Sequence, residues 1–246
     1  MRCTHGVAWK WRRQRLDREP LEIMIAIDQL VRTKRRTLAI IVEDDGRVVV
    51  RAPLRLKQEA IDEFVRARET WILTKRRQAL ERANRFVPKS YVSGEEFLYL
   101  GEPYRLEIED HQRQPLLLNG GFRMSRAALP RAQAVFERWY RRQALRVMSE
   151  RAGAYAARHG FAFDRIRITS ARKRWGSCGH KGNLSFAWRL VMAPQPVIDY
   201  VVVHELAHLK HRNHSKRFWS KVASILPDFR QREDWLEEHG YLLRLS

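Results

Sequence analysis

The sequence HELAH at residues 204–208, with a further histidine at position 214, constrains the fold of this chain more than any other feature. Two histidines four residues apart on an α-helix lie on the same face, about one turn apart, so His204 and His208 can bind one metal ion. Glu205 lies one residue beyond the first histidine, where its carboxylate can take a proton from a metal-bound water. The motif therefore predicts a helix with two ligands and a general base, and Glu205 is not itself a ligand.

Chance explains this spacing poorly. The chain contains nine histidines, and at such frequencies a random HExxH with a histidine also at position 214 is expected in roughly 0.1% of chains. A catalytic zinc site takes three protein ligands and leaves the fourth position to water, whose pKa the metal lowers to about 7. The sequence therefore predicts a hydrolase with one zinc ion as its cofactor.

The third ligand has several candidates. His211 falls on the same helical stripe, but it lies about 10.5 Å along the axis from His204, too far for three rings to close on one ion. Glutamates of the last helix are further candidates, although a solvated helix face is their more usual role; they are Glu233, Glu237 and Glu238. We favour His214, because the polar residues before it allow the chain to leave the helix and fold back.

The residues around the motif favour a helix from about 196 to 211. Pro196 suits the first helical position, and Asp199 is expected in the positively polarised first turn. The valines at 201–203 alone favour a strand, but apolar residues at three- and four-residue steps indicate a buried helix packed on a sheet. Ser215 is suited to cap the next helix, which we expect to end at Pro227.

The chain before the motif alternates between strand and helix patterns. Apolar β-rich runs at 37–42 and 48–52 flank an Asp-Gly turn and predict a hairpin. A helix is expected from about 57 to 85, where apolar residues recur at helical steps. A second hairpin is predicted from strands at 97–100 and 104–108, turning at a Gly-Glu-Pro sequence.

The segment immediately before the motif predicts a place for substrate. A helical pattern from about 130 to 159 ends at Gly160, a suitable C-terminal glycine. A strand at 165–170 and a hairpin with strands at 175–178 and 184–188 follow. A peptide cleaved beside zinc must lie extended, and pairing with an exposed sheet edge holds it so. We therefore predict that the first hairpin strand is such an edge.

The predicted substrate-binding residues of this hairpin are Trp175, Gly176, Ser177, Cys178 and Asn183. Residue type alone leaves another interpretation open, in which the tryptophan packs in the core and the glycine relieves a bulge. The cysteine is more often a small buried hydrophobe than a nucleophile.

The net charge and the cysteine content indicate the cellular compartment and the kinds of partner to expect. The net charge of +20 attracts polyanions, so nonspecific contact with nucleic acid is expected, although attraction is not recognition. No run approaches the roughly 20 apolar residues of a membrane span, and the first residues carry charges where a signal peptide is apolar. The two distant cysteines, Cys3 and Cys178, fit a reducing compartment. We expect a cytoplasmic protein that does not interact with membranes.

The sequence also resembles the YgjP-like metallopeptidases. The resemblance rests on RWGSC at 174–178, Gly182-Asn183, the Trp-Arg-Leu at 188–190, Pro194, the run IDYVVVHELAHLKHRNHSKRFW at 198–219, and Pro227. It covers roughly residues 21 to 241, and it implies a zincin-like domain with His204, His208 and His214 as zinc ligands and Glu205 as the catalytic residue. SprT-like domains are more distantly similar. The ligand spacing equals that of metzincins, but His211 stands where those have glycine.

These patterns together predict an α+β fold in which the HExxH helix packs under a small mixed sheet. We expect a basic, disordered arm at 1–20, β-hairpins and a long helix at 21–125, and the zincin-like catalytic domain at 126–246. The function predicted first is a zinc metallopeptidase acting on a peptide or protein. A metal-dependent hydrolase of nucleotides or other phosphate esters, and a nucleic-acid-associated protein with a structural metal site, are the alternatives.

Overall fold

The computed structural model describes residues 25–246, which divide into two compact units, residues 25–87 and residues 88–246. The predicted basic arm at 1–20 lies outside the described residues. None of the described helices is long and apolar enough to cross a membrane. Each unit has its own hydrophobic core.

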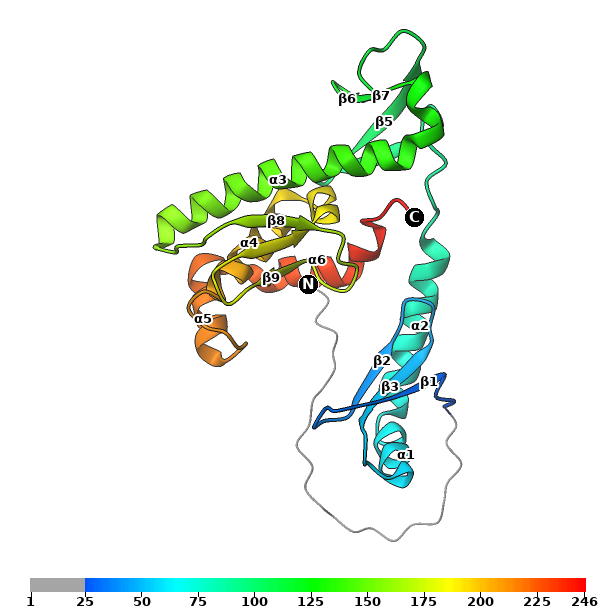
Figure 1. Cartoon of the computed structure of the whole chain (residues 1–246), viewed down its shortest axis with the longest axis vertical. Helices are drawn as coiled ribbons and strands as arrows, with labels where there is room; N and C mark the ends of the chain where they lie inside the picture. Colours follow the sequence, from blue (N-terminus) through cyan, green and yellow to red (C-terminus); the bar gives the residue numbers. More distant parts are fainter. Residues whose placement is uncertain (1–24) are drawn as a thin grey trace. The chain divides into compact units, whose positions relative to one another are not determined.

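The unit of residues 25–87 is a three-stranded sheet with two helices (Figure 1). The predicted hairpin is present as β2 (Ala39–Val42) paired antiparallel with β3 (Val48–Pro53). A strand that the sequence pattern did not predict, β1 (Gln29–Thr33), pairs parallel with the other edge of β3.

The single helix predicted from 57 to 85 is wrong, because it is two helices, α1 (Gln58–Arg66) and α2 (Glu69–Arg85). The Arg68 side chain explains where the first helix ends. Its guanidinium lies 3.7 Å from the centre of the Phe64 ring and donates a hydrogen bond to the Phe64 carbonyl at 3.2 Å. A last-turn carbonyl is thus satisfied by a side chain and not by a continuing helix.

The unit of residues 88–246 begins with a four-stranded sheet in the order β4-β5-β7-β6. Its strands are β4 (Glu96–Tyr99), β5 (Glu102–Glu109), β6 (Leu116–Leu118) and β7 (Phe122–Ser125). The pairing of β4 with β5 confirms the second predicted hairpin. Its turn has φ of 53° at Leu100 and 90° at Gly101. A Cβ on Gly101 would lie 2.8 Å from Cα of Pro194, so the turn packs tightly against the start of the HELAH helix.

This sheet shares its core with the rest of the unit. Phe97 of β4 stacks on Phe136 at 4.1 Å between ring centres, and the Tyr140 hydroxyl donates a hydrogen bond to the Leu98 carbonyl at 2.7 Å. The predicted boundary near residue 125 therefore differs from the observed division between residues 87 and 88. The reason is that the second hairpin buries its aromatic side chains against the later helices and not against the N-terminal hairpin.

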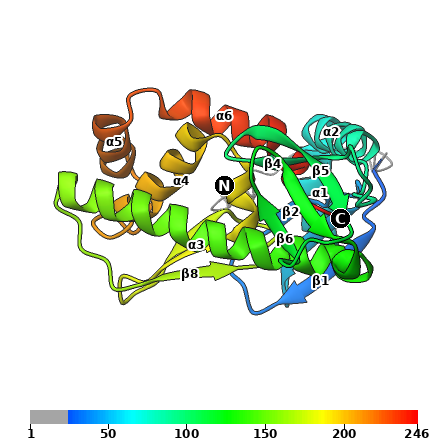
Figure 2. The ribbon, with the colours of Figure 1, turned by 90° about the horizontal axis from the view of Figure 1, so that it is seen from above.

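The long helix of this unit is α3 (Ala132–His159), which follows the short 3-10 helix η1 (Arg126–Arg131). It ends at Gly160, which has the left-handed φ of 65° expected of a C-terminal glycine. Figures 1 and 2 show α3 running along β8 and α4, both of which it contacts.

The second sheet of the unit has the order β8-β10-β9. Its strands are β8 (Ile166–Thr169), β9 (Gly176–Cys178) and β10 (Leu184–Ala187). β8 runs parallel to β10, and β9 pairs antiparallel with the other side of β10. The predicted edge position of the 175–178 strand is confirmed.

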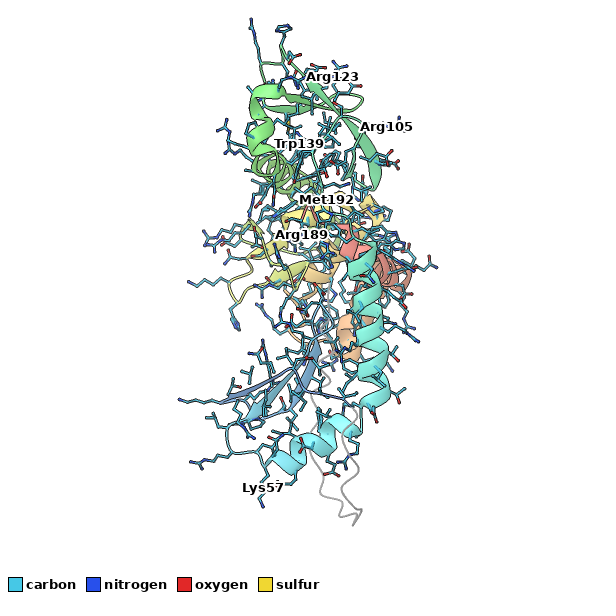
Figure 3. The ribbon with its side chains drawn as sticks, turned by 90° about the vertical axis from the view of Figure 1, so that its right-hand side faces the viewer. Lys57, Arg105, Arg123, Trp139, Arg189 and Met192 are labelled. Carbon is cyan, nitrogen blue, oxygen red and sulfur yellow. The ribbon has the colours of Figure 1, made fainter. Side chains whose placement is uncertain are left out.

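A 3-10 helix, η2 (Trp188–Met192), connects β10 to the HELAH helix. Two of its residues, Arg189 and Met192, are labelled in Figure 3. The Arg189 guanidinium donates to the Ala171 carbonyl at 2.7 Å, which ties η2 to the loop before β9. The Met192 carbonyl accepts from the Gly101 amide at 3.1 Å.

The HELAH helix is α4 (Gln195–Ala207), followed by α5 (Lys216–Ile225), α6 (Phe229–His239) and the 3-10 turn η3 (Gly240–Leu242). Every residue from Val197 to Ala207 is buried, and α4 contacts α3, α5, α6 and β9. Burial on all sides explains why the valine run is helical despite its strand preference.

Two details of α4 differ from the prediction. The helix ends at Ala207 and not near residue 211, because the next residues turn with bonds to carbonyls three residues back: Leu209 to Leu206 at 3.0 Å and Lys210 to Ala207 at 3.1 Å. Asp199 lies beyond the first turn and is held by Arg151 of α3 through two hydrogen bonds of 2.6 and 2.7 Å. Its role is therefore an ion pair between helices.

Candidate metal centre

The C-terminal end of α4 places the first half of the candidate site. His204 and Glu205 are 0% and 1% exposed, in the last turn of the helix. His208 follows at the C-cap position with helical backbone angles, so it keeps the one-turn spacing from His204 although the regular helix has ended. The predicted pair of histidines one turn apart therefore lies at the end of the helix, where the chain reverses direction.

The reversal brings His214 back to the two helix histidines. His204, His208 and His214 each offer one ring nitrogen, and these nitrogens all lie within 4.8 Å of one another. The Nε2 atoms of His204 and His214 are 2.9 Å apart. Two ring nitrogens bound to one tetrahedral zinc at its usual bond length are about 3.3 Å apart. The three side chains therefore fit one small metal ion.

The environment keeps the three imidazoles neutral, which is the form that binds metal. Burial, together with the neighbouring His208 and His214, lowers the pKa of His204 to about 2. Burial also lowers the pKa of His208 and of His214, although the Glu233 carboxylate acts in the opposite direction on His214. The ring nitrogens are thus available as ligands without prior loss of a proton.

His211 contributes through its backbone and not through its ring. The Nδ1 atom of His208 lies 3.0 Å from the His211 carbonyl oxygen, to which it donates. This bond leaves Nε2 of His208 for the metal and fixes the ring orientation, as partners of metal-bound histidines usually do. The ring of His211 is outside the cluster, and so are the glutamates that competed for the third position.

Glu205 is a buried carboxyl without a partner in the described part of the chain. Neither of its carboxylate oxygens has a hydrogen bond there. Burial raises the pKa of this carboxyl to about 8, and the Arg174 charge opposes the shift. An unpaired buried carboxylate costs several kcal/mol, so its presence here points to a role other than stability. The group is suited to accept and return a proton near neutral pH.

Gly176 leaves the space that Glu205 occupies. A Cβ at Gly176 would lie 2.5 Å from Oε1 and 2.6 Å from Cγ of Glu205, closer than real Cβ contacts allow. The edge strand β9 therefore touches the general-base position with its backbone. Of the five hairpin residues predicted to bind substrate, this one has a direct contact with the candidate catalytic group.

The other four have different surroundings. Trp175 is 7% exposed, and its ring is the nearest neighbour of Gly240, so it packs in the core. Ser177 is half-buried and pairs with Ser185 of β10. Burial raises the pKa of the Cys178 thiol, which keeps it protonated. The Asn183 side chain accepts a hydrogen bond from Arg165 at 2.9 Å.

The contacts of Arg212 could not be predicted from sequence patterns. This residue lies between the second and third candidate ligands, and its guanidinium donates to the carbonyls of Gly179 and His180 at 2.9 and 3.0 Å. Both acceptors are backbone atoms more than 30 residues away, so no local motif marks them.

A buried HExxH helix that meets a third histidine and a sheet edge defines a metallopeptidase-type hydrolase. The chain belongs to the YgjP-like family: the model described as "YgjP-like, metallopeptidase domain" matches residues 36–239. The predicted family and the zincin-like α+β fold class are thereby confirmed.

Two relatives are similar over part of their length or of this chain. UTP pyrophosphatase of Escherichia coli (strain K12) is 44% identical over 68 residues, which are 28% of this chain and 41% of that protein. The chain therefore matches less than half of the length of this relative. The crystal structure of the metallopeptidase zymogen of Pyrococcus abyssi abylysin has a TM-score of 0.35 and 22% identity, and the match covers 39% of this chain and 96% of that one.

Proposed function

We propose that the protein is a zinc-dependent metallopeptidase in which His204, His208 and His214 hold the ion and Glu205 is the general base. The observation that carries this proposal is the Glu205 carboxyl, which is buried, lacks a partner among the described residues and lies directly against the backbone of β9. A buried acid beside three neutral imidazoles is costly for stability and useful for proton transfer.

Each part of the proposed site has its own role in hydrolysis. A zinc ion in this cluster would supply the Lewis acidity that lowers the pKa of a water to about 7. The Glu205 carboxylate accepts the proton of the attacking water and then donates it to the leaving amine, so one water is consumed and the base is restored. The exposed guanidinium of Arg174, whose charge acts on Glu205, is the proposed partner of the negative charge that develops on the attacked carbonyl.

The edge strand supports a peptide as the substrate. In the described residues β9 pairs with β10 on one side, and Gly176 at its start lies beside Glu205. An extended peptide added to the other side of β9 would pass the general base with its backbone parallel to the sheet. We propose that Ser177 and Cys178 contribute backbone hydrogen bonds to such a peptide.

A second candidate function is the hydrolysis of a nucleoside triphosphate, as in the relative named UTP pyrophosphatase. Charge favours it. From residue 165 to residue 227 the acidic residues of the sequence are Asp199 and Glu205, both buried, whereas Arg and Lys recur throughout that stretch. An excess of positive charge along this stretch attracts a polyanionic substrate.

The test compares the two substrates on one preparation. The protein is incubated with an unbiased peptide library and, separately, with UTP, each with zinc, with a chelator, and with a chelator followed by zinc. The peptidase proposal expects zinc-dependent peptide cleavage and no release of pyrophosphate. Release of pyrophosphate without peptide cleavage would replace it with the second candidate, and turnover that resists the chelator would contradict both.

A further inference from the structure

The third candidate ligand, His214, lies on a segment with less burial and fewer backbone hydrogen bonds than the segment that carries the other two. His204 is buried in α4 and His208 follows it directly, whereas His214 is exposed and precedes α5. In the described part of the chain, the backbone of residues 212–214 makes no hydrogen bond with other backbone. The loop between the ligands therefore needs another support if His214 is to stay at the ion.

Aromatic rings restrict the His214 side chain but not the loop. Its ring lies 4.8 Å from the Phe218 ring and is stacked on Trp219 at 5.7 Å, both on α5. These contacts limit the rotation of the imidazole. The position of the backbone that carries it depends on the residues before it.

Arg212 supplies the missing support from two residues away. Its Nη1 donates to the Gly179 carbonyl at 2.9 Å and its Nη2 donates to the His180 carbonyl at 3.0 Å. The same Nη1 contacts Sγ of Cys178 at 3.7 Å. The planar guanidinium thus donates to two consecutive carbonyls of the β9–β10 turn. A lysine ammonium cannot reproduce this two-pronged geometry.

The turn to which Arg212 donates is also held by hydrogen bonds of its own. The Gly179 amide donates to the Asn183 carbonyl at 2.8 Å, and the Gly182 amide donates back to the Gly179 carbonyl at 3.1 Å. Arg165 holds the same turn from another side through the Asn183 side chain at 2.9 Å. The two arginines share an anchor, but of the two it is Arg212 that links the turn to the ligand loop by hydrogen bonds.

We propose that Arg212 is a positioning residue for the third metal ligand: it fastens the loop of residues 209–215 to the β9–β10 turn and so holds His214 at the ion. The inference rests on the proposed metal site. Because Gly179 directly follows β9, the Arg212 hydrogen bonds also link the ligand loop to the edge strand.

Zinc affinity measured by competition with a chelating dye tests the proposal on the full chain. Loss of an outer partner of a metal ligand typically weakens metal binding by about 10- to 100-fold. We expect a loss in that range for Arg212→Gln, a smaller loss for Arg212→Lys, and wild-type affinity for the matched control Arg165→Gln. Equal affinity of Arg212→Gln and the wild type would overturn the proposal, and so would an equal loss in Arg165→Gln.

The absorption spectrum of the cobalt(II)-substituted protein supplies a second measurement that a purely structural role would not change. Loss of His214 from the ion replaces a nitrogen ligand with water, so the visible bands of Arg212→Gln should shift and weaken while those of Arg165→Gln match the wild type. An unchanged spectrum in Arg212→Gln contradicts the proposal. If the wild type itself binds no metal, the proposed function fails, which is a different outcome from a wild type and a variant that bind equally.

Discussion

The candidate site has two halves that are built differently. The helix half consists of His204 and Glu205, both buried in α4, a helix surrounded by α3, α5, α6 and β9. The loop half consists of His214, which is exposed and whose loop is tied to the rest of the unit by Arg212. The helix half is fixed by packing, whereas the loop half depends on a few hydrogen bonds.

This difference suggests that the two halves have different tasks: the helix half carries the general base, and the loop half completes the metal site. The base needs a dry, constant environment, because burial sets its pKa. A third ligand on an exposed loop needs only to reach the ion, so a long-range side-chain contact suffices. Apart from the ligand His204 itself, mutations in the helix half should therefore affect turnover or folding, and mutations in the loop half should affect metal affinity.

The largest effect is expected from Glu205→Gln. The amide keeps the shape of the side chain but cannot accept the proton, and general-base catalysis typically contributes about 10²- to 10⁴-fold. Turnover of the substrate found for the wild type should fall by that factor while zinc affinity changes little. Glu233→Gln, whose residue lies near His214 but outside the cluster, is the matched control and should retain turnover. Full activity of Glu205→Gln would remove Glu205 as the base.

Gly176→Ala should have the next largest effect. The new methyl group would meet Glu205 at 2.5 Å, and overpacking of this kind costs about 1–3 kcal/mol of unfolding free energy. Displacement of the carboxylate should also lower turnover, with zinc affinity close to that of the wild type.

Gly179→Ala in the same hairpin is the control, because its nearest atom would be 3.5 Å away. Chemical unfolding and steady-state kinetics of the two variants measure the difference. Equal behaviour of both variants would show that the close approach to Glu205 is unimportant.

Asp199→Asn tests the anchoring of the helix half on α3. It removes the charge that accepts two hydrogen bonds from Arg151 and one from the Tyr155 hydroxyl at 3.2 Å. The pair is partly buried, so we expect a loss of about 1–3 kcal/mol in unfolding free energy, between the values for exposed and fully buried pairs. Asp164→Asn, in an exposed pair with Arg165 at 3.8 Å, should change stability by less than about 0.5 kcal/mol. A larger effect at Asp164 than at Asp199 would reverse this account.

The smallest effect is expected from Ser215→Ala in the loop half. Ser215 stands at the N-cap position of α5 but its side chain makes no capping hydrogen bond. The usual loss of about 1 kcal/mol for a removed cap should therefore not occur. Thermal unfolding and zinc titration should match the wild type. A clear loss of stability, or weaker zinc binding, would show that the loop half has a support that the contacts of Arg212 do not provide.

Local patterns predicted the helix half well. The HELAH spacing, the helical steps of the apolar residues and the terminating Gly160 are short-range features, and α3, α4 and the three predicted hairpins are present. The meeting of three histidines was also predictable, because their separation in the chain is short. Local patterns thus located these elements, although they did not show the break between α1 and α2 or the end of α4 at Ala207.

The remaining features depend on contacts that sequence patterns do not contain. Strands β1, β6 and β7 are three to five residues long, too short for a clear alternation. The second hairpin joins the C-terminal unit through aromatic packing between distant residues. Gly176 and Arg212 matter through partners on other elements, Glu205 and the β9–β10 turn. Such roles follow from the folded chain alone.

The zinc content of the purified protein after dialysis tests the central claim most directly. The account predicts about one zinc per chain in the wild type and in His211→Ala, whose ring is outside the cluster, and none in His204→Ala. Folding of each variant is verified by circular dichroism. A natively folded wild type without metal, or an unchanged zinc content in His204→Ala, would contradict it.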